Sequence, residues 1–193
     1  MANDFGLFVA AEPLKCTGCR ACELACFQAH NVGRNQVGKT VGTIGTPVTP
    51  KLYVTVIETA SMPVQCKHCE NSPCKAVCKQ SAIIRLGHQV IVDENKCIGC
   101  KDCLVACPFG AVTLLPYYNK RKPVKQSGSN EDKVAASKCD LCFEEVDGPA
   151  CVRACPNEAL RVSDINEDRK KKNIAAAEAL AVVNAGTPER RAL

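Results

Sequence analysis

The stretch Cys97-Ile98-Gly99-Cys100-Lys101-Asp102-Cys103-Leu104-Val105-Ala106-Cys107-Pro108 decides the fold of this chain. Its cysteines follow the spacing C-x2-C-x2-C-x3-C-P, which is typical of [4Fe–4S] binding. The first three cysteines can wrap a single loop around one cluster. The fourth lies on the helical turn that follows, and in proteins with two such clusters it ligates the neighbouring one. The run therefore predicts a partner run elsewhere in the chain.

Three further cysteine runs repeat this pattern with small changes of spacing. Numbered along the chain, the first run has Phe27 where the third has its proline, the second has a longer loop, and the fourth has an insertion before its third cysteine. Their cysteines are Cys16, Cys19, Cys22 and Cys26; Cys66, Cys69, Cys74 and Cys78; and Cys139, Cys142, Cys151 and Cys155. All 16 cysteines fall into the four runs, so the sequence predicts four [4Fe–4S] clusters.

The gaps between the runs predict which runs share clusters. The shortest gap, from Cys78 to Cys97, has room for one hairpin, so the second and third runs are expected to form an inner module. The first and fourth runs then form an outer module, which the inner one interrupts. With the fourth cysteines exchanged, the predicted ligand sets are Cys66, Cys69, Cys74 with Cys107; Cys97, Cys100, Cys103 with Cys78; Cys16, Cys19, Cys22 with Cys155; and Cys139, Cys142, Cys151 with Cys26. Pairing in sequential order is the open alternative.

The predicted fold class is α+β: two nested bacterial-type 2[4Fe–4S] ferredoxin modules related by pseudo-twofold symmetry, plus a C-terminal helix. The outer module covers residues 1–50 with 116–163, the inner module 51–115, and a helical tail 164–193. Short strands are expected at 7–9, 52–57, 111–115 and 159–162, with a glycine-turn hairpin over 82–92. Residues 116–133 have the composition of a surface loop.

The tail predicts a helix that Ser163 or Asp164 caps and that ends near Gly186. Its small apolar stripe consists of Ile174, Ala177, Leu180, Ala181 and Val183. An isolated helix of this kind is marginal in water, so the stripe is expected to pack on something. Two interpretations are open: it packs against its own domain, or it docks a catalytic subunit or another copy of the chain.

The composition favours metal-bound thiols. The N-terminus lacks the features of an export signal, so we expect a reducing cytoplasm, in which cysteines bind metal instead of forming disulfides. No apolar stretch reaches the roughly 18–20 residues of a membrane span. Four clusters, each about −2 with its thiolates, would bring the formal charge of +5 to roughly −3, so basicity does not support a nucleic-acid partner.

Other chemistries fit the sequence less well. Residues 33–40 match G-x4-G-K-[ST], but no strand precedes them and the glycine-rich residues that follow cannot start a helix, so a loop without nucleotide is predicted. Zinc is an alternative at one place, because Cys139, Cys142, Cys151 and Cys155 resemble a zinc ribbon. The chain shows no Ser–His–Asp or paired-carboxylate constellation, so we expect no catalytic residues and no enzyme activity of its own.

A few polar residues stand beside the predicted ligands. Lys15, Lys96 and Lys138 each precede the first cysteine of a run, where a cation would raise the potential of a cluster unless the side chain is simply solvated. His68 lies between two ligands and could donate a hydrogen bond to cluster sulfur, or else be exposed. His30 carries no usable signal.

The four runs, with Lys-Cys-Asp-Leu-Cys at 138–142 and Gly-Pro-Ala-Cys at 148–151, resemble a known superfamily over roughly Phe5 to Val162. It comprises the four-cluster ferredoxin-like electron-transfer (beta) subunits of formate dehydrogenases, hydrogenases, carbon monoxide dehydrogenase and molybdopterin oxidoreductases. In that family the first run pairs with the fourth and the second with the third, as the spacing also predicts. Larger members carry a C-terminal transmembrane helix, so the resemblance is to the short soluble type.

The resemblance implies that the chain relays single electrons to or from a separate catalytic subunit. A formate dehydrogenase, a hydrogenase or both are the first choice of partner, and other ferredoxin-like subunits or copies of the chain are further candidates. The alternatives are a partnership with carbon monoxide dehydrogenase, a freely diffusing polyferredoxin, and a structural or redox-sensing iron–sulfur protein.

Overall fold

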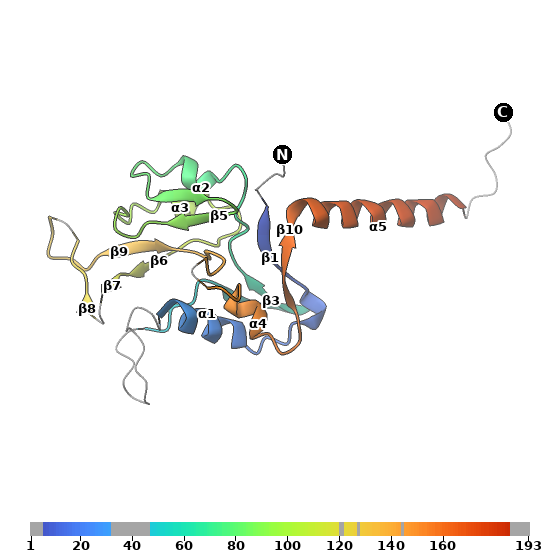
Figure 1. Ribbon diagram of the computed structural model, residues 1–193, viewed down its shortest axis with the longest axis horizontal. Helices are drawn as coiled ribbons and strands as arrows, with labels where there is room; N and C mark the ends of the chain where they lie inside the picture. Colours follow the sequence, from blue (N-terminus) through green and yellow to red (C-terminus); the bar gives the residue numbers. More distant parts are fainter. Residues whose placement is uncertain (1–5, 32–46, 120–121, 127, 144, 186–193) are drawn as a thin grey trace.

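The computed structural model describes residues 6–31, 47–119, 122–126, 128–143 and 145–185 (Figure 1). The helices are η1 (Pro13–Lys15), α1 (Ala21–Asn31), α2 (Pro73–Ala76), α3 (Asp102–Ala106), α4 (Ala150–Arg153) and α5 (Ile165–Ala185). The strands are β1 (Leu7–Ala11), β2 (Tyr53–Ile57), β3 (Ala60–Val64), β4 (Ile83–Leu86), β5 (Gln89–Val92), β6 (Thr113–Pro116), β7 (Tyr118–Asn119), β8 (Lys122–Pro123), β9 (Val134–Ser137) and β10 (Leu160–Asp164). This mixture of short helices and strands confirms the α+β prediction.

The strands form small antiparallel pairs and no large sheet within the described residues. The pairs are β1–β10, β2–β3, β4–β5, β6–β9 and β7–β8. The expected strands are present, and the hairpin β4–β5 turns at Gly87, whose φ of 53° is natural for glycine. The prediction of a loop over 116–133 is wrong in part, because β7 and β8 pair there and Lys125 bridges to Asp132.

The two ends of the cysteine-rich region meet in the strand pair β1–β10. Leu7 pairs with Asp164 and Ala11 with Leu160, and β1 leads into the first run while β10 follows the fourth. The helix of the first run, α1, packs on α4 of the fourth, and α2 of the second run packs on α3 of the third. The chain thus brings the first run to the fourth and the second to the third (Figure 1).

A repeated turn follows the fourth cysteine in three of the runs. The third residue after that cysteine has a positive φ each time: 50° at Ser81, 59° at Gly110 and 49° at Glu158. Its amide donates to the carbonyl of the cysteine at 3.0, 3.3 and 3.2 Å respectively. A short strand begins two or three residues later, so the sequence repeat is also a structural repeat.

Alternate runs along the chain also resemble each other in backbone conformation. The residue before the second cysteine is Gly18 in the first run and Gly99 in the third, both with a φ of 72°. Helices α2 and α4, of the second and fourth runs, each have four residues and end in nearly the same backbone conformation. The first run therefore resembles the third, and the second resembles the fourth.

Two apolar clusters form the core, and cysteines are a large part of both. One contains Val9, Cys22, Cys26, Leu52, Val54, Cys66, Cys139, Leu141, Cys151 and Leu160. The other contains Cys74, Ile83, Val90, Cys103, Val112 and Ala136. Leu52 and Val54 thus pack with the first and fourth runs, and Ala136 packs with the second and third, so packing crosses the boundaries expected at residues 51 and 116.

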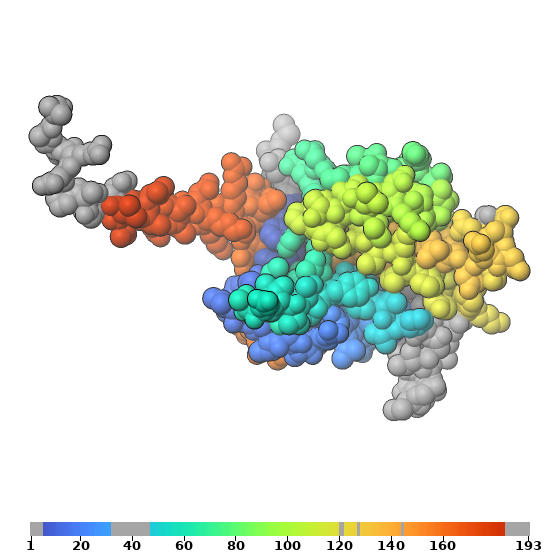
Figure 2. Space-filling view, turned by 180° about the vertical axis from the view of Figure 1, so that it is seen from behind, coloured from blue at the N-terminus to red at the C-terminus, as the bar shows by residue number. Residues whose placement is uncertain are grey.

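Helix α5 projects from the body of the molecule, and no other described segment covers it (Figures 1 and 2). The Asp164 carboxylate caps it by accepting from the amides of Asn166 and Glu167 at 2.7 and 3.3 Å. Leu180 and Val183, in the predicted apolar stripe, are 64% and 69% exposed. The interpretation that the stripe packs on its own domain is therefore wrong. The predicted end at Gly186 lies outside the described residues.

The base of α5 is fixed by ion pairs. The Asp168 carboxylate accepts from Arg161 at 2.8 Å and lies 3.1 Å from Lys172, and these partners lower its pKa to about 2. Ile165 packs closely on Gly6 and donates its amide to the Gly6 carbonyl at 2.9 Å. A search of the described helices finds none with the length and hydropathy needed to cross a bilayer.

Deletion of residues 173–193 should leave the body of the protein intact, because the side chains that the structure describes in α5 beyond Lys172, those of residues 173–183, are exposed. We expect the free energy of unfolding to change by less than about 0.5 kcal/mol. Anaerobic guanidinium denaturation of the full-length and truncated proteins measures this. A loss of more than about 1 kcal/mol would mean that α5 packs on the body.

Candidate functional site

Three small cavities each gather four cysteines from two runs. One is lined by Cys66, Cys69, Cys74 and Cys107. The second is lined by Cys78, Cys97, Cys100 and Cys103, and the third by Cys16, Cys19, Cys22 and Cys155. In each cavity three cysteines come from one run and the fourth comes from its partner run.

The remaining four cysteines lie together between the first and fourth runs. Cys26, Cys139 and Cys151 share one core cluster. The Cys142 thiol interacts electrostatically with Cys26, and Cys151 interacts with both Cys26 and Cys142. All sixteen cysteines lie within the described residues, and none forms a disulfide.

This grouping argues against two alternatives. A zinc ribbon would need Cys155 beside Cys139, Cys142 and Cys151, but Cys155 lines the cavity of the first run. Sequential pairing would need Cys78 beside the first run, but Cys78 lines the cavity of the third. The individual ligand assignments stay predictions.

Seven of the sixteen thiols lie where burial makes the proton hard to remove without a metal. Burial raises the pKa of Cys22, Cys103 and Cys142 to about 11, and that of Cys151 to about 12. Because metal ligation needs the thiolate, the positive charge of bound iron has to replace the proton. Cluster binding and folding are therefore coupled.

Backbone amides point at the cysteine sulfurs, as expected for thiolate acceptors. His68 and Leu141 donate to the Sγ atoms of Cys66 and Cys139 at 3.3 and 3.4 Å, at matching positions of the second and fourth runs. Ala82 and Ala159 donate to Cys78 and Cys155 at 3.3 and 3.2 Å, again at matching positions. Such hydrogen bonds help to set the potential of an iron–sulfur cluster.

The side chain of His68 is fully buried, so of the two alternatives for this residue the exposed one is wrong. Its Nδ1 accepts the Val90 amide at 2.9 Å, which leaves the proton on Nε2. Within the part of the chain that the structure describes, this Nε2 has no hydrogen-bond partner. An orphaned buried donor between two ligand cysteines fits a group with sulfur acceptors, as do the amides above.

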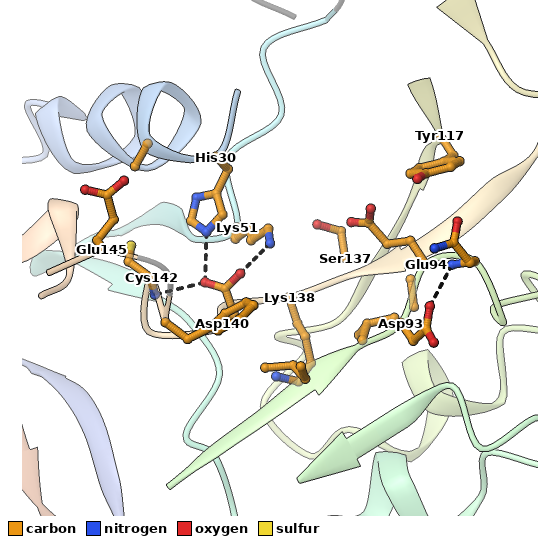
Figure 3. Close-up of a pocket in the computed structure, with 16 residues that line it drawn as sticks. His30, Lys51, Asp93, Glu94, Tyr117, Ser137, Lys138, Asp140, Cys142 and Glu145 are labelled. Atoms are coloured by element: carbon orange, nitrogen blue, oxygen red, sulfur yellow. Dashed lines mark hydrogen bonds and ion pairs between the residues drawn. The ribbon is translucent and has the colours of Figure 1, made fainter. Parts of the chain in front are cut away.

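A buried ionic network ties the first run to the fourth (Figure 3). The Asp140 carboxylate accepts from His30 Nε2 at 2.8 Å, Lys51 Nζ at 2.6 Å and the Cys142 amide at 2.9 Å. His30 Nδ1 in turn lies 2.7 Å from the Cys26 carbonyl and Lys51 donates its amide to Cys26 Sγ at 3.3 Å. This Asp140 clamp holds Cys26 beside the loop of the fourth run.

The protonation states in the clamp follow from its contacts. Burial raises the pKa of Asp140, but the hydrogen bond from His30 and the charge of Lys51 outweigh it and hold that pKa well below its usual range. Burial opposes the protonation of His30, but the hydrogen bond to Asp140 prevails and raises its pKa to about 9. The clamp therefore contains a carboxylate between two cations.

The Asp140 clamp was not predicted from the sequence. His30 lies one helical turn after Cys26, but nothing in the sequence links it to Asp140 or Lys51.

A cavity of about 480 Å³ adjoins the clamp and reaches Asp93, Tyr117 and Ser137 (Figure 3). Cys142 is the one cysteine in its lining, so the other fifteen lie elsewhere. The ligand-like atoms of His30, Asp140 and Cys142 lie within 4.8 Å of one another. Asp140 is already satisfied by its cations.

Comparison with known proteins agrees with this chemistry. Residues 57–165 match the 4Fe-4S dicluster domain family. The chain is 39% identical to the electron transport protein HydN of Escherichia coli strain K12 over 164 residues, which cover 83% of this chain and 89% of HydN. It is 37% identical to hydrogenase-4 component A of the same strain (88% and 90% covered) and 34% identical to an iron–sulfur protein of Rhodospirillum rubrum (84% and 85% covered).

The cysteine cavities, the amides directed at sulfur and these relatives define an iron–sulfur electron-transfer protein. The chain belongs to the 4Fe-4S dicluster domain family. It binds several [4Fe–4S] clusters, and its 16 cysteines suffice for four.

The substitution Asp140→Asn should destabilise the holo-protein by about 3 kcal/mol, because it leaves the buried His30 and Lys51 cations without a counter-charge. Anaerobic denaturation followed through cluster absorbance measures the loss. The control is Asp132→Asn, which breaks the exposed Lys125–Asp132 pair and should cost less than about 1 kcal/mol. Equal effects of the two substitutions would contradict the clamp.

Proposed function

We propose that the chain is the electron-transfer subunit of an oxidoreductase complex and performs no bond chemistry of its own. It relays single electrons between a separate catalytic subunit and an acceptor or donor. The observation that carries this proposal is the collection of all sixteen cysteines into four adjoining sites. A [4Fe–4S] cluster, once bound, accepts and donates one electron at a time.

Three of the proposed ligand sets follow the cavities, and the fourth follows the group that the remaining four cysteines form. We assign Cys66, Cys69, Cys74 with Cys107; Cys97, Cys100, Cys103 with Cys78; Cys16, Cys19, Cys22 with Cys155; and Cys139, Cys142, Cys151 with Cys26. Each set takes three cysteines from one run and one from its partner. The residues of this chain hold the sites in place through the α1–α4 and α2–α3 contacts.

The two nested ferredoxin modules are part of the proposal. The outer module comprises the first and fourth runs, joined by β1–β10, and the inner module comprises the second and third. The matching turns at Gly18 and Gly99, and the matching helices α2 and α4, support a pseudo-twofold relation between the modules.

We infer that the four sites follow one another in a row. Cys22 and Cys151 interact electrostatically, Cys66 packs in the same core cluster as Cys139 and Cys22, and Cys74 and Cys103 share the other cluster. This order puts the sets of Cys139 and Cys66 in the middle and the sets of Cys16 and Cys97 at the ends. Cys19 and Cys100, one at each end, are the two cysteines that are exposed. A row with accessible ends and a buried middle suits a relay.

We further propose a formate dehydrogenase, a hydrogenase or both as the catalytic partner. The similarity to hydrogenase-4 component A supports a hydrogenase, and the superfamily resemblance adds formate dehydrogenase. The exposed helix α5 is the proposed docking element for this partner, for another ferredoxin-like subunit or for a second copy. Free thiols in such number suit the reducing cytoplasm.

Cysteine substitutions test the exchange between runs. Cys78→Ser and Cys100→Ser should each remove about four irons, and the double variant should lose no more, because both cysteines serve one cluster. The control pair Cys78→Ser with Cys69→Ser should lose about eight. If the control pair lost four and the test pair eight, each run would hold its own cluster.

Co-purification tests the function. Tagged full-length chain, isolated without oxygen from its native cells, should retain a catalytic subunit in fixed stoichiometry, with formate- or hydrogen-dependent reduction of a viologen dye. The 173–193 deletion, which keeps the Asp168 ion pairs, should lose that subunit or form a smaller assembly. A stable monomer that carries clusters but no partner would favour the free polyferredoxin.

A further inference from the structure

Three lysines directly precede the first cysteine of their runs, but only one of them, Lys138, is buried. Lys15 and Lys96 are 52% and 61% exposed, and each lies beside a carboxylate, Glu12 at 2.9 Å and Asp93 at 3.6 Å. Lys138 is only 3% exposed. Its Nζ donates to the carbonyls of Val90 and of Cys139, the latter at 2.8 Å.

A buried ammonium needs a counter-charge, because desolvation costs several kcal/mol. Among the described residues, no carboxylate forms an ion pair with Lys138, and two carbonyl dipoles supply only partial negative charge. The nearest buried carboxylate on its own loop, Asp140, is already held by His30 and Lys51. The negative charge that Lys138 requires has to come from another group.

Lys138 lies between the second and fourth runs. It directly precedes Cys139, and its carbonyl contact with Val90 anchors it to strand β5 of the inner module. The Lys138 ammonium interacts electrostatically with Cys69 and Cys74 of the second run. One cation therefore faces ligand cysteines of two neighbouring sites.

His68 adds no second positive charge at this junction. Its Nδ1 accepts the amide of Val90, the same residue whose carbonyl accepts from Lys138. Because Nδ1 is the acceptor, the imidazole carries only its Nε2 proton and is neutral. Lys67 and Arg85 are further cations near this junction, but both are only partly buried, so Lys138 is the buried charge here.

We propose that Lys138 is a shared, buried counter-charge for the two middle clusters and raises their reduction potentials. The clusters meant are those of Cys66, Cys69, Cys74 with Cys107 and of Cys139, Cys142, Cys151 with Cys26. This proposal rests on the proposed relay. Each reduction adds one negative charge, and a fixed cation in a poorly screened interior favours that reduced state. Lys15 and Lys96, which are solvated and paired, have no comparable effect.

The test is a redox titration of the anaerobically purified holo-protein, followed by electron paramagnetic resonance. Lys138→Gln should shift two of the four potentials in the negative direction and leave the other two in place. Lys138→Arg, which keeps the charge, should restore both potentials towards wild type. Lys15→Gln and Lys96→Gln are the matched controls and should leave all four unchanged.

Iron analysis of the same samples separates this proposal from the function on which it rests. If the wild type holds four clusters and Lys138→Gln shifts none, or shifts all four alike, the role of Lys138 is refuted and the relay stands. If the wild type holds fewer clusters, the relay itself fails. If Lys138→Gln loses iron and Lys138→Arg retains it, the result supports a counter-charge role for Lys138. Loss of iron in both variants contradicts that role.

Discussion

The structure depends on one constraint: a cysteine run can offer three thiols to a site beside its own loop, but its fourth cysteine lies beyond the next helical turn and faces another loop. Cys107 lines the cavity of the second run and Cys78 that of the third. Runs must therefore come in pairs. The antiparallel β1–β10 ladder and the α1–α4 packing satisfy this requirement for the first and fourth runs, although most of the chain separates them.

The same constraint shapes the electrostatics. Cysteines occupy much of both core clusters, and burial raises the pKa of five of them, so the fold and its metal content depend on each other. The five are Cys22, Cys74, Cys103, Cys139 and Cys151. Charges buried among them need partners. Asp140 is balanced by His30 and Lys51 within the chain, whereas the hydrogen bonds of Lys138 among the described residues go to carbonyls. Helix α5 lies apart from all of this, so its apolar side chains are available to another molecule.

The sequence predicted the features that spacing controls. It predicted the α+β class, the hairpin of β4 and β5, the helical tail and the runs that lie together. It missed β3, because Pro63 normally signals a break; in an isolated two-stranded pair, a proline can point its ring nitrogen away from the partner strand. It could not separate Lys138 from Lys15 and Lys96, since identical local patterns differ only in what the rest of the fold packs on them. The contacts of Asp140 with His30 and Lys51 could not be predicted for the same reason.

We infer that all sixteen cysteines serve four [4Fe–4S] clusters. Iron, acid-labile sulfide and zinc analysis of the anaerobically purified chain is the decisive test. We expect about sixteen irons and sixteen sulfides per chain, with no zinc. About four irons per chain, or one zinc in place of a cluster, would contradict it.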